Sequence, residues 1–127
     1  MPTTKLIFFR EPDGTAPAVE WLTQLRKENG KAFAKCRVRL DRLALMGHEL
    51  RRPEADYLRD DIYELRTRLG TVNYRMLYFF HGRQAVVVSH GFTKEADVPR
   101  REIEQAIARR RAFLAEPSKH TYEREVE

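Results

Sequence analysis

The sequence is poor in cysteine: Cys36 is the single cysteine among 127 residues. One cysteine cannot form an internal disulfide, and no cysteines and histidines have the spacing of a zinc site. We therefore expect Cys36 to be a small thiol buried in the core. The absence excludes a disulfide framework and a cysteine-based zinc centre.

Long apolar runs are also missing. No stretch approaches the ~20 apolar residues of a membrane-spanning helix, and the run at residues 6–9 is too short for the core of a signal peptide. We therefore expect a cytoplasmic protein. The length suits one domain with a modest core, which we assign to residues 1–114. Residues 115–127 are polar and have no apolar period, so we expect a frayed or disordered tail.

Charge of one sign dominates the rest of the chain. The formal net charge is +5, although acidic residues outnumber basic ones after Ala115. Arginine supplies 18 of the 24 basic residues, and its planar guanidinium suits bidentate contacts with phosphate. A nucleic acid or an acidic protein would fit this composition, but an arginine-rich coding bias explains it equally well.

Hydrophobic periodicity predicts an α+β domain. A strand is expected at residues 5–10, and apolar residues at helical spacing predict two helices joined at Asn29-Gly30, over residues 15–28 and 31–46. Thr15 is a plausible N-cap of the first. The polar residues 48–60 read as a loop. Three strands then follow at residues 62–69, 72–80 and 84–92, and a helix at residues 99–114.

The predicted order is β-α-α-β-β-β-α. Short connections between the last three strands force antiparallel pairing. We expect a mainly antiparallel sheet in which the helical hairpin and the C-terminal helix pack on one face.

The three-strand segment carries the candidate functional residues. Side chains alternate along a strand, so Glu64, Arg66 and Arg68 share one face of the first strand, and Arg75 lies on one face of the second. If Arg66 and Arg75 point to a helix-free face, they are close enough to bind one phosphate. In the third strand, the same alternation places His90 and Phe92 together with Val86 and Val88.

Arginine beside aromatic residues is typical of single-stranded RNA recognition, in which cations bind phosphates and rings stack on bases. The RNA 2′-hydroxyl can attack the adjacent phosphorus without a metal or other cofactor. It needs a base, cations for the developing charge and an acid for the leaving oxygen. Arg66 and Arg75 suit the charge role, and His90 is the candidate for proton transfer. Lys94 could contact phosphate or act as a base.

Tyr78 could stack on a base or assist proton transfer, and Arg68 and Phe92 complete the candidate RNA-binding set. Each assignment has a structural alternative. Arg66 could pair with Glu64 or Asp61, and Arg75 could be a packed structural arginine. His90 could be a hydrogen-bonded sheet histidine, and Lys94 a solvated loop residue. Glu64 fits an orienting partner for arginine better than a general base.

Three motifs together carry a resemblance: YELR at residues 63–66, YRMLYFF at 74–80 and VVVSHGFTKE at 86–95, followed by a helix that opens with Pro99. They resemble the HigB-like, phage-derived branch of the RelE/ParE toxin superfamily over about residues 6–114. The resemblance implies a small bacterial type II toxin that cuts mRNA on the ribosome. It also implies a cognate helix-turn-helix antitoxin that neutralises the toxin in a hetero-oligomeric complex.

The resemblance assigns phosphate binding and catalysis to the arginines of the ELR and YR segments, Arg66 and Arg75. Its HGFxKK segment is matched by His90, Gly91, Phe92 and Lys94, whereas Glu95 stands in place of the second lysine. Two alternatives remain open. A ParE-type inhibitor of gyrase shares the fold without RNA chemistry, and a catalytically weakened toxin-fold protein would only bind its antitoxin.

Overall fold

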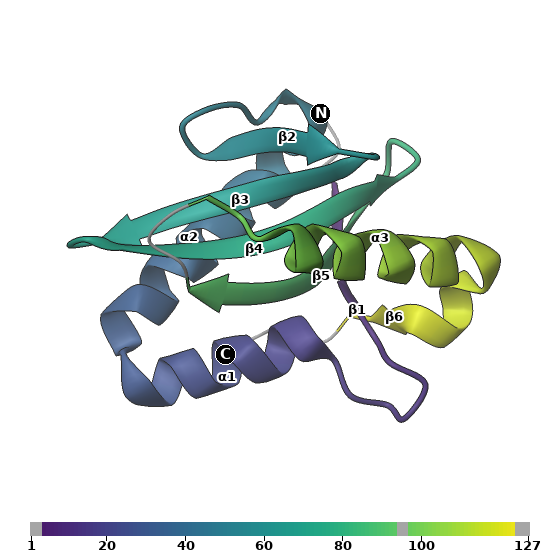
Figure 1. Cartoon of the computed structure of the whole chain (residues 1–127), viewed down its shortest axis with the longest axis horizontal. Coiled ribbons are helices and arrows are strands. Elements are labelled where there is room, and N and C mark those ends of the chain that lie inside the picture. The colour runs from purple at the N-terminus through teal and green to yellow at the C-terminus, as the bar shows by residue number, and fades with distance from the viewer. Residues whose placement is uncertain (1–3, 94–96, 124–127) are drawn as a thin grey trace.

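A six-stranded sheet and three α-helices make up the part of the chain that the structure describes. The computed structural model describes residues 4–93 and 97–123. The strands lie in the order β2-β3-β4-β5-β1-β6, and β1 pairs parallel with β5 while the other pairs are antiparallel (Figure 1). The strands are β1 (Lys5–Phe9), β2 (Ala55–Arg59), β3 (Ile62–Leu69), β4 (Val72–His81), β5 (Ala85–Thr93) and β6 (Thr121–Tyr122). The helices are α1 (Pro17–Glu28), α2 (Gly30–Met46) and α3 (Arg100–Ala115).

The α+β class and the mainly antiparallel sheet are confirmed, but the helices cover both faces of the sheet. Tyr78 of β4 packs in a core with α1 and α2, whereas its neighbours Leu77 and Phe79 pack in a second core with α3. Figure 1 shows α3 crossing the sheet on the side away from α2. The expectation that α3 shares a face with the hairpin is therefore wrong. Helical periodicity predicts an apolar stripe on α3 but does not say which side of the sheet receives it.

The turn between α1 and α2 depends on Asn29. Its side-chain oxygen accepts a hydrogen bond from the Ala32 N–H at 3.1 Å, so the residue that ends α1 also caps α2. Pro17 opens α1, where a missing N–H costs nothing. Thr15, the expected N-cap, instead hydrogen-bonds Asp13, and Ala16 holds the cap position.

Two segments expected to be irregular join the sheet. The expected loop at residues 48–60 contains β2, which pairs with β3. The expected frayed tail contains a 3-10 turn (Pro117–His120) and β6, which pairs with β1. His120 is buried there, where its Nδ1 donates to the Arg10 carbonyl at 2.7 Å and its ring stacks on Phe9.

A β-bulge in β5 changes the side-chain alternation that the sequence predicts. Val88 pairs with Tyr78 but His90 pairs with Leu77, so Ser89 is an extra residue between them. Directly opposed residues point to the same face. The bulge therefore turns His90 and Phe92 onto the α3 face, while Val86 and Val88 remain on the hairpin face. The predicted grouping of these four side chains on one face is wrong.

Cys36 lies fully buried between helices and sheet, as expected. Burial raises the pKa of its thiol to about 12, which keeps the sulfur protonated and unreactive. None of the helices in the part of the chain that the structure describes is long and apolar enough to cross a membrane.

The close contact between β5 and α1 makes Gly91 sensitive to substitution. A Cβ at this position would lie 2.2 Å from Cε3 of Trp21. We expect Gly91→Ala to lower the free energy of unfolding by about 1–3 kcal/mol, because the ring must move within a packed layer. Urea denaturation measures the change.

Gly30→Ala is the matched control, because a Cβ there meets no atom within 4 Å. It should leave the free energy of unfolding unchanged or raise it by up to about 1 kcal/mol. Equal stability losses for the two variants would contradict the role of Trp21.

Candidate functional site

Two arginines lie directly opposite each other on neighbouring strands of the α3 face. Arg66 of β3 pairs in register with Arg75 of β4. Glu64 lies between them: its Oε1 is 2.7 Å from Arg66 Nε and 2.5 Å from Arg75 Nη1. One carboxylate thus neutralises part of a two-cation cluster, and the three groups keep a net positive charge.

The members of this cluster differ in their access to solvent. The side chains of Glu64 and Arg75 are 3% and 7% exposed, whereas that of Arg66 is 41% exposed. Arg66 is therefore the cation that a ligand can reach directly. Arg75 and Glu64 form a buried ion pair. Burial of such a pair is tolerated only when each charge is compensated by the other and by hydrogen bonds.

His90 reaches the same face through the β5 bulge. Its Nε2 lies 3.2 Å from Glu102 Oε1 of α3, and its Nδ1 lies 2.8 Å from Ser89 Oγ. A carboxylate only accepts, so Nε2 carries the proton and Ser89 donates to Nδ1. Burial and the nearby Arg109 guanidinium lower the pKa of His90, while Glu102 acts in the opposite direction. The neutral imidazole is favoured, which suits a proton acceptor.

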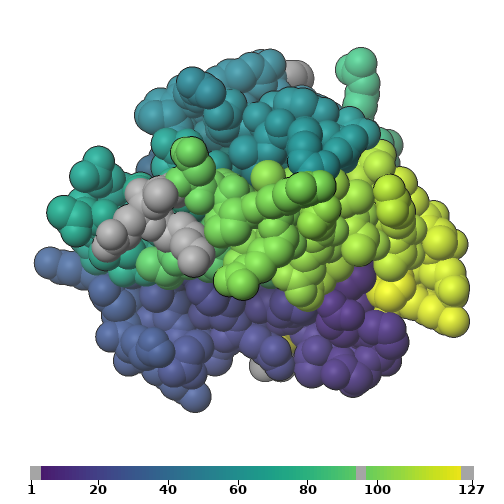
Figure 2. All heavy atoms as spheres, viewed as in Figure 1, coloured from purple at the N-terminus to yellow at the C-terminus, as the bar shows by residue number. Residues whose placement is uncertain are grey.

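Ion pairs attach α3 to the sheet above these residues. Arg109 Nε donates to Glu11 Oε1 at 2.9 Å, and its Nη1 donates to Ser89 Oγ at 3.4 Å. Arg110 lies 3.4 Å from Asp61 in the turn before β3. Figure 2 shows α3, in green, covering the middle of this face between the β2–β4 region and the N-terminal segments. The helix thus forms one wall of the site.

The structure brings together four of the seven residues singled out in the sequence. Arg66, Arg75, His90 and Phe92 lie on the α3 face, where Phe92 is opposite Arg75 and packs in the α3 core. The predicted pairing of Arg66 with Glu64 also occurs.

The other three residues do not join this group. Arg68 is exposed near the end of β3, where its Nε donates to the Gly70 carbonyl at 2.9 Å. Tyr78 is 1% exposed and lies on the opposite face, where it stacks on Tyr63. The expected stacking of Tyr78 on an RNA base is therefore not possible in this structure. Burial raises the pKa of its hydroxyl far above the ordinary value, which disfavours proton transfer. Lys94 lies outside the described residues, as does Glu95.

Three polar groups around His90 could not be predicted from the sequence: Glu102, Ser89 and Arg109. Nothing in the sequence pattern connects Glu102 with a histidine twelve residues earlier. Alternation places Ser89 on the face of Val87, but the bulge that brings His90 onto the same face leaves no clear sequence signal. Arg109 sits in a basic run that reads as a solvated helix end. In the described part of the chain, no group of three or more His, Cys, Asp and Glu side chains could hold a metal ion.

Comparison with known proteins gives one family. Residues 20–111 match the family described as Phage derived protein Gp49-like (DUF891). The match covers most of the chain, from α1 to α3, and includes every residue of the Glu64 cluster and of the His90 site except Glu11. No curated protein matches the chain.

The buried carboxylate between two arginines predicts a large loss of stability on its removal. Glu64→Gln should lower the free energy of unfolding by about 3 kcal/mol, because it removes the carboxylate charge that pairs with the buried Arg75 guanidinium. Chemical denaturation measures the loss. Glu104→Gln removes an exposed pair with Arg100 and should cost less than about 0.5 kcal/mol. Similar losses in the two variants would count against a structural role for Glu64.

The lowered pKa of His90 predicts a pH-dependent stability. Below the ordinary value of 6.5 the unfolded chain binds a proton that the folded protein resists, so the free energy of unfolding falls as pH falls. Wild type should lose more stability than His90→Asn between pH 7.5 and 5.5, by up to about 1.4 kcal/mol per pH unit. The other three histidines are present in both proteins and cancel. Parallel curves of unfolding free energy against pH would show that His90 does not titrate in this way.

Proposed function

The chain belongs to the phage-derived Gp49-like family, part of the RelE/ParE-like toxin group, and we propose that it is a type II toxin that cuts mRNA. The observation that carries the proposal is the convergence of Arg66, Arg75 and His90 from three adjacent strands onto one face. Two cations and a neutral imidazole can supply the charge stabilisation and the base that metal-free RNA cleavage needs.

The proposed reaction begins with attack of an RNA 2′-oxygen on the adjacent phosphorus. His90 takes the 2′-hydroxyl proton at Nε2, which requires that the substrate replaces Glu102 as its partner and that the ring proton moves to Nδ1, facing Ser89. The new bond joins the 2′-oxygen to phosphorus, and the bond to the 5′-oxygen breaks. The products are a 2′,3′-cyclic phosphate and a 5′-hydroxyl. The leaving 5′-oxygen takes a proton from water, and Lys94 is proposed to contact the phosphate.

Arg66 and Arg75 have different parts in this proposal. Arg66, the more exposed cation, contacts the phosphate and stabilises the charge that develops on its oxygens. Arg75 holds Glu64, and Glu64 in turn orients Arg66. Arg68, exposed at the end of β3, contacts the RNA backbone farther along, and Phe92 supports the guanidinium of Arg75 from the neighbouring strand.

For the cellular setting, we propose a toxin of the HigB-like branch that acts in the cytoplasm on mRNA held by the ribosome. A helix-turn-helix antitoxin would be its partner in a hetero-oligomer. The net charge of +5 supports an RNA or acidic-protein partner.

A second candidate function is a toxin-fold protein that binds its antitoxin without cutting RNA. It is favoured by the carboxylates that pair with the candidate reactive groups. Glu64 pairs with both arginines, and Glu102 pairs with His90. The two functions differ in one measurable result, because only the first produces broken transcripts.

Arg66→Ala tests the proposal. Induced wild-type protein should arrest bacterial growth and produce cleaved transcripts, whereas Arg66→Ala should cut about 10²–10³-fold more slowly and relieve the arrest. Mapping of transcript 5′ ends measures cleavage. Arg37→Ala is the control, because it removes an exposed arginine from the outer side of α2.

The other readings predict different results. Arrest with intact mRNA would refute RNA cleavage, and arrest with DNA-damage signalling would indicate a gyrase inhibitor of the ParE type. Absence of any growth effect would favour the antitoxin-binding protein. Circular dichroism of purified Arg66→Ala should match wild type, because Arg66 is partly exposed.

A further inference from the structure

A second polar and aromatic hollow lies at the free edge of the sheet, beside β2. Its volume is about 670 Å³, and it lies between the segment that follows α2 and strands β2 and β3. We name it the β2 groove. Its lining residues are His48, Leu50, Arg51, Arg52, Ala55, Asp56, Tyr57 and Tyr63.

Tyr57 presents an aromatic ring to this groove in a fixed orientation. It is 52% exposed and is the one aromatic residue among the large exposed hydrophobic side chains of the described ranges. Its ring packs edge-on against Tyr63 at 5.1 Å, and its hydroxyl accepts a hydrogen bond from the Asp61 N–H at 3.1 Å. A ring held at both ends loses little entropy when a second ring stacks on it.

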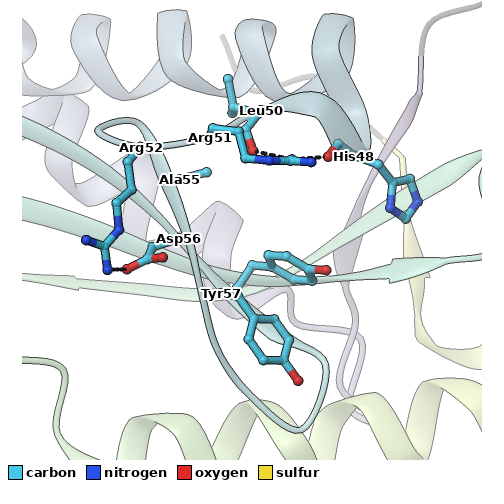
Figure 3. Close-up of a pocket in the computed structure, with 8 residues that line it drawn as sticks. His48, Leu50, Arg51, Arg52, Ala55, Asp56 and Tyr57 are labelled. Carbon is cyan, nitrogen blue, oxygen red and sulfur yellow. Dashed lines mark hydrogen bonds and ion pairs between the residues drawn. The ribbon is translucent and has the colours of Figure 1, made fainter.

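Arg51 supplies the charge. Its Nη1 donates to the carbonyl oxygens of His48 and Leu50, which orients the guanidinium. Within residues 4–93 and 97–123, no carboxylate lies within ion-pair distance of Arg51, whereas Arg52 pairs with Asp56 at 2.7 Å. Figure 3 shows Arg51 and His48 along one side of the hollow, Tyr57 along the other, and the Arg52–Asp56 pair at one end. The β2 groove therefore combines an oriented cation with an exposed ring.

The β2 groove adjoins the Glu64 cluster across a single strand. Tyr57 pairs in register with Tyr63, and Asp56 pairs with Glu64, the next residue of β3. Tyr63 and Glu64 point to opposite faces of the sheet, but β2 is the last strand at this edge. A flexible strand that crosses β2 can therefore contact the arginines on one face and the tyrosines on the other.

We infer that the β2 groove binds one nucleotide of single-stranded RNA, with its base stacked on Tyr57 and its phosphate on Arg51. Arginine with exposed aromatic rings is the combination that binds single strands, and each stacked base contributes appreciably to affinity. An acidic peptide would satisfy Arg51 but would not need the exposed face of Tyr57. The inference rests on the proposed function, because it assigns to the β2 groove a neighbouring nucleotide of the same RNA.

Binding can be measured apart from cleavage with a fluorescent ten-nucleotide RNA that is 2′-O-methylated throughout. It has no 2′-hydroxyl, so it cannot be cut by the proposed reaction. We expect Tyr57→Ala in the full chain to raise Kd about tenfold by loss of stacking, and Tyr57→Phe to bind like wild type. Fluorescence anisotropy gives the Kd values, and circular dichroism verifies that each variant is folded.

Salt dependence isolates the phosphate contact. Arg51→Gln should lower the slope of log Kd against log salt concentration by about 0.7, the loss of one phosphate contact on a single strand. Arg51→Lys should keep the slope. Arg37→Gln removes the same charge from exposed α2 and should leave both Kd and the slope near wild type.

The outcomes separate this inference from the proposed function. Loss of affinity in Tyr57→Ala, with Arg37→Gln unchanged, supports the β2 groove even if no transcript is cut in cells. Wild-type affinity in both Tyr57→Ala and Arg51→Gln overturns it even if Arg66→Ala abolishes cleavage, and so does failure of wild type to bind the oligonucleotide. If Tyr57→Ala and Arg51→Gln bind RNA normally but capture the antitoxin more weakly than wild type, the β2 groove is a protein-docking surface. This result would also overturn the inference.

Discussion

Burial of both faces of the central strands is the constraint on which the rest of the molecule depends. Strands β4 and β5 have α1 and α2 on one side and α3 on the other, so the polar and charged side chains buried between these layers must find partners within the protein. Glu64 does this for Arg75, Glu102 for His90 and Glu11 for Arg109. The same pairing positions the groups that could act on RNA, and it leaves Arg66 as the cluster's exposed charge.

Much of the fold could be predicted from local pattern alone. The bounds of β3 match the prediction, and alternation correctly grouped Glu64 with Arg66. The face shared by Arg66 and Arg75 is not helix-free, because α3 packs on it. Alternation failed in β5, because one extra residue at Ser89 reverses the direction of every later side chain. Strand β2 was missed because an edge strand that carries partly buried charges, Asp56 and Arg59, and an exposed tyrosine shows no apolar period. The side of the sheet that α3 covers depends on tertiary packing, and the sequence of α3 alone does not determine it.

The strand residues of the candidate site could be predicted from the sequence, but their long-range partners could not. Arg66, Arg75 and His90 lie within 25 positions of one another on consecutive antiparallel strands. On such strands, spacing along the sequence indicates which residues are close in space. Glu102 and Arg109 belong to a separate element, and their contacts depend on how α3 crosses the sheet. The β2 groove could not be predicted either, because Arg51 and Tyr57 lie in a segment whose polar composition is typical of a solvated loop.

The position of β1 has a consequence for how the chain folds. Its two neighbours are β5 and β6, both from the second half of the chain. Its pairing with β5 encloses some 80 residues, so the entropy of closing a long loop opposes it until the β3–β5 meander is in place. The meander and the helical hairpin rely on near-neighbour contacts and can organise earlier. Strand β1 is therefore synthesised well before its two partner strands but is among the last to be incorporated into the sheet.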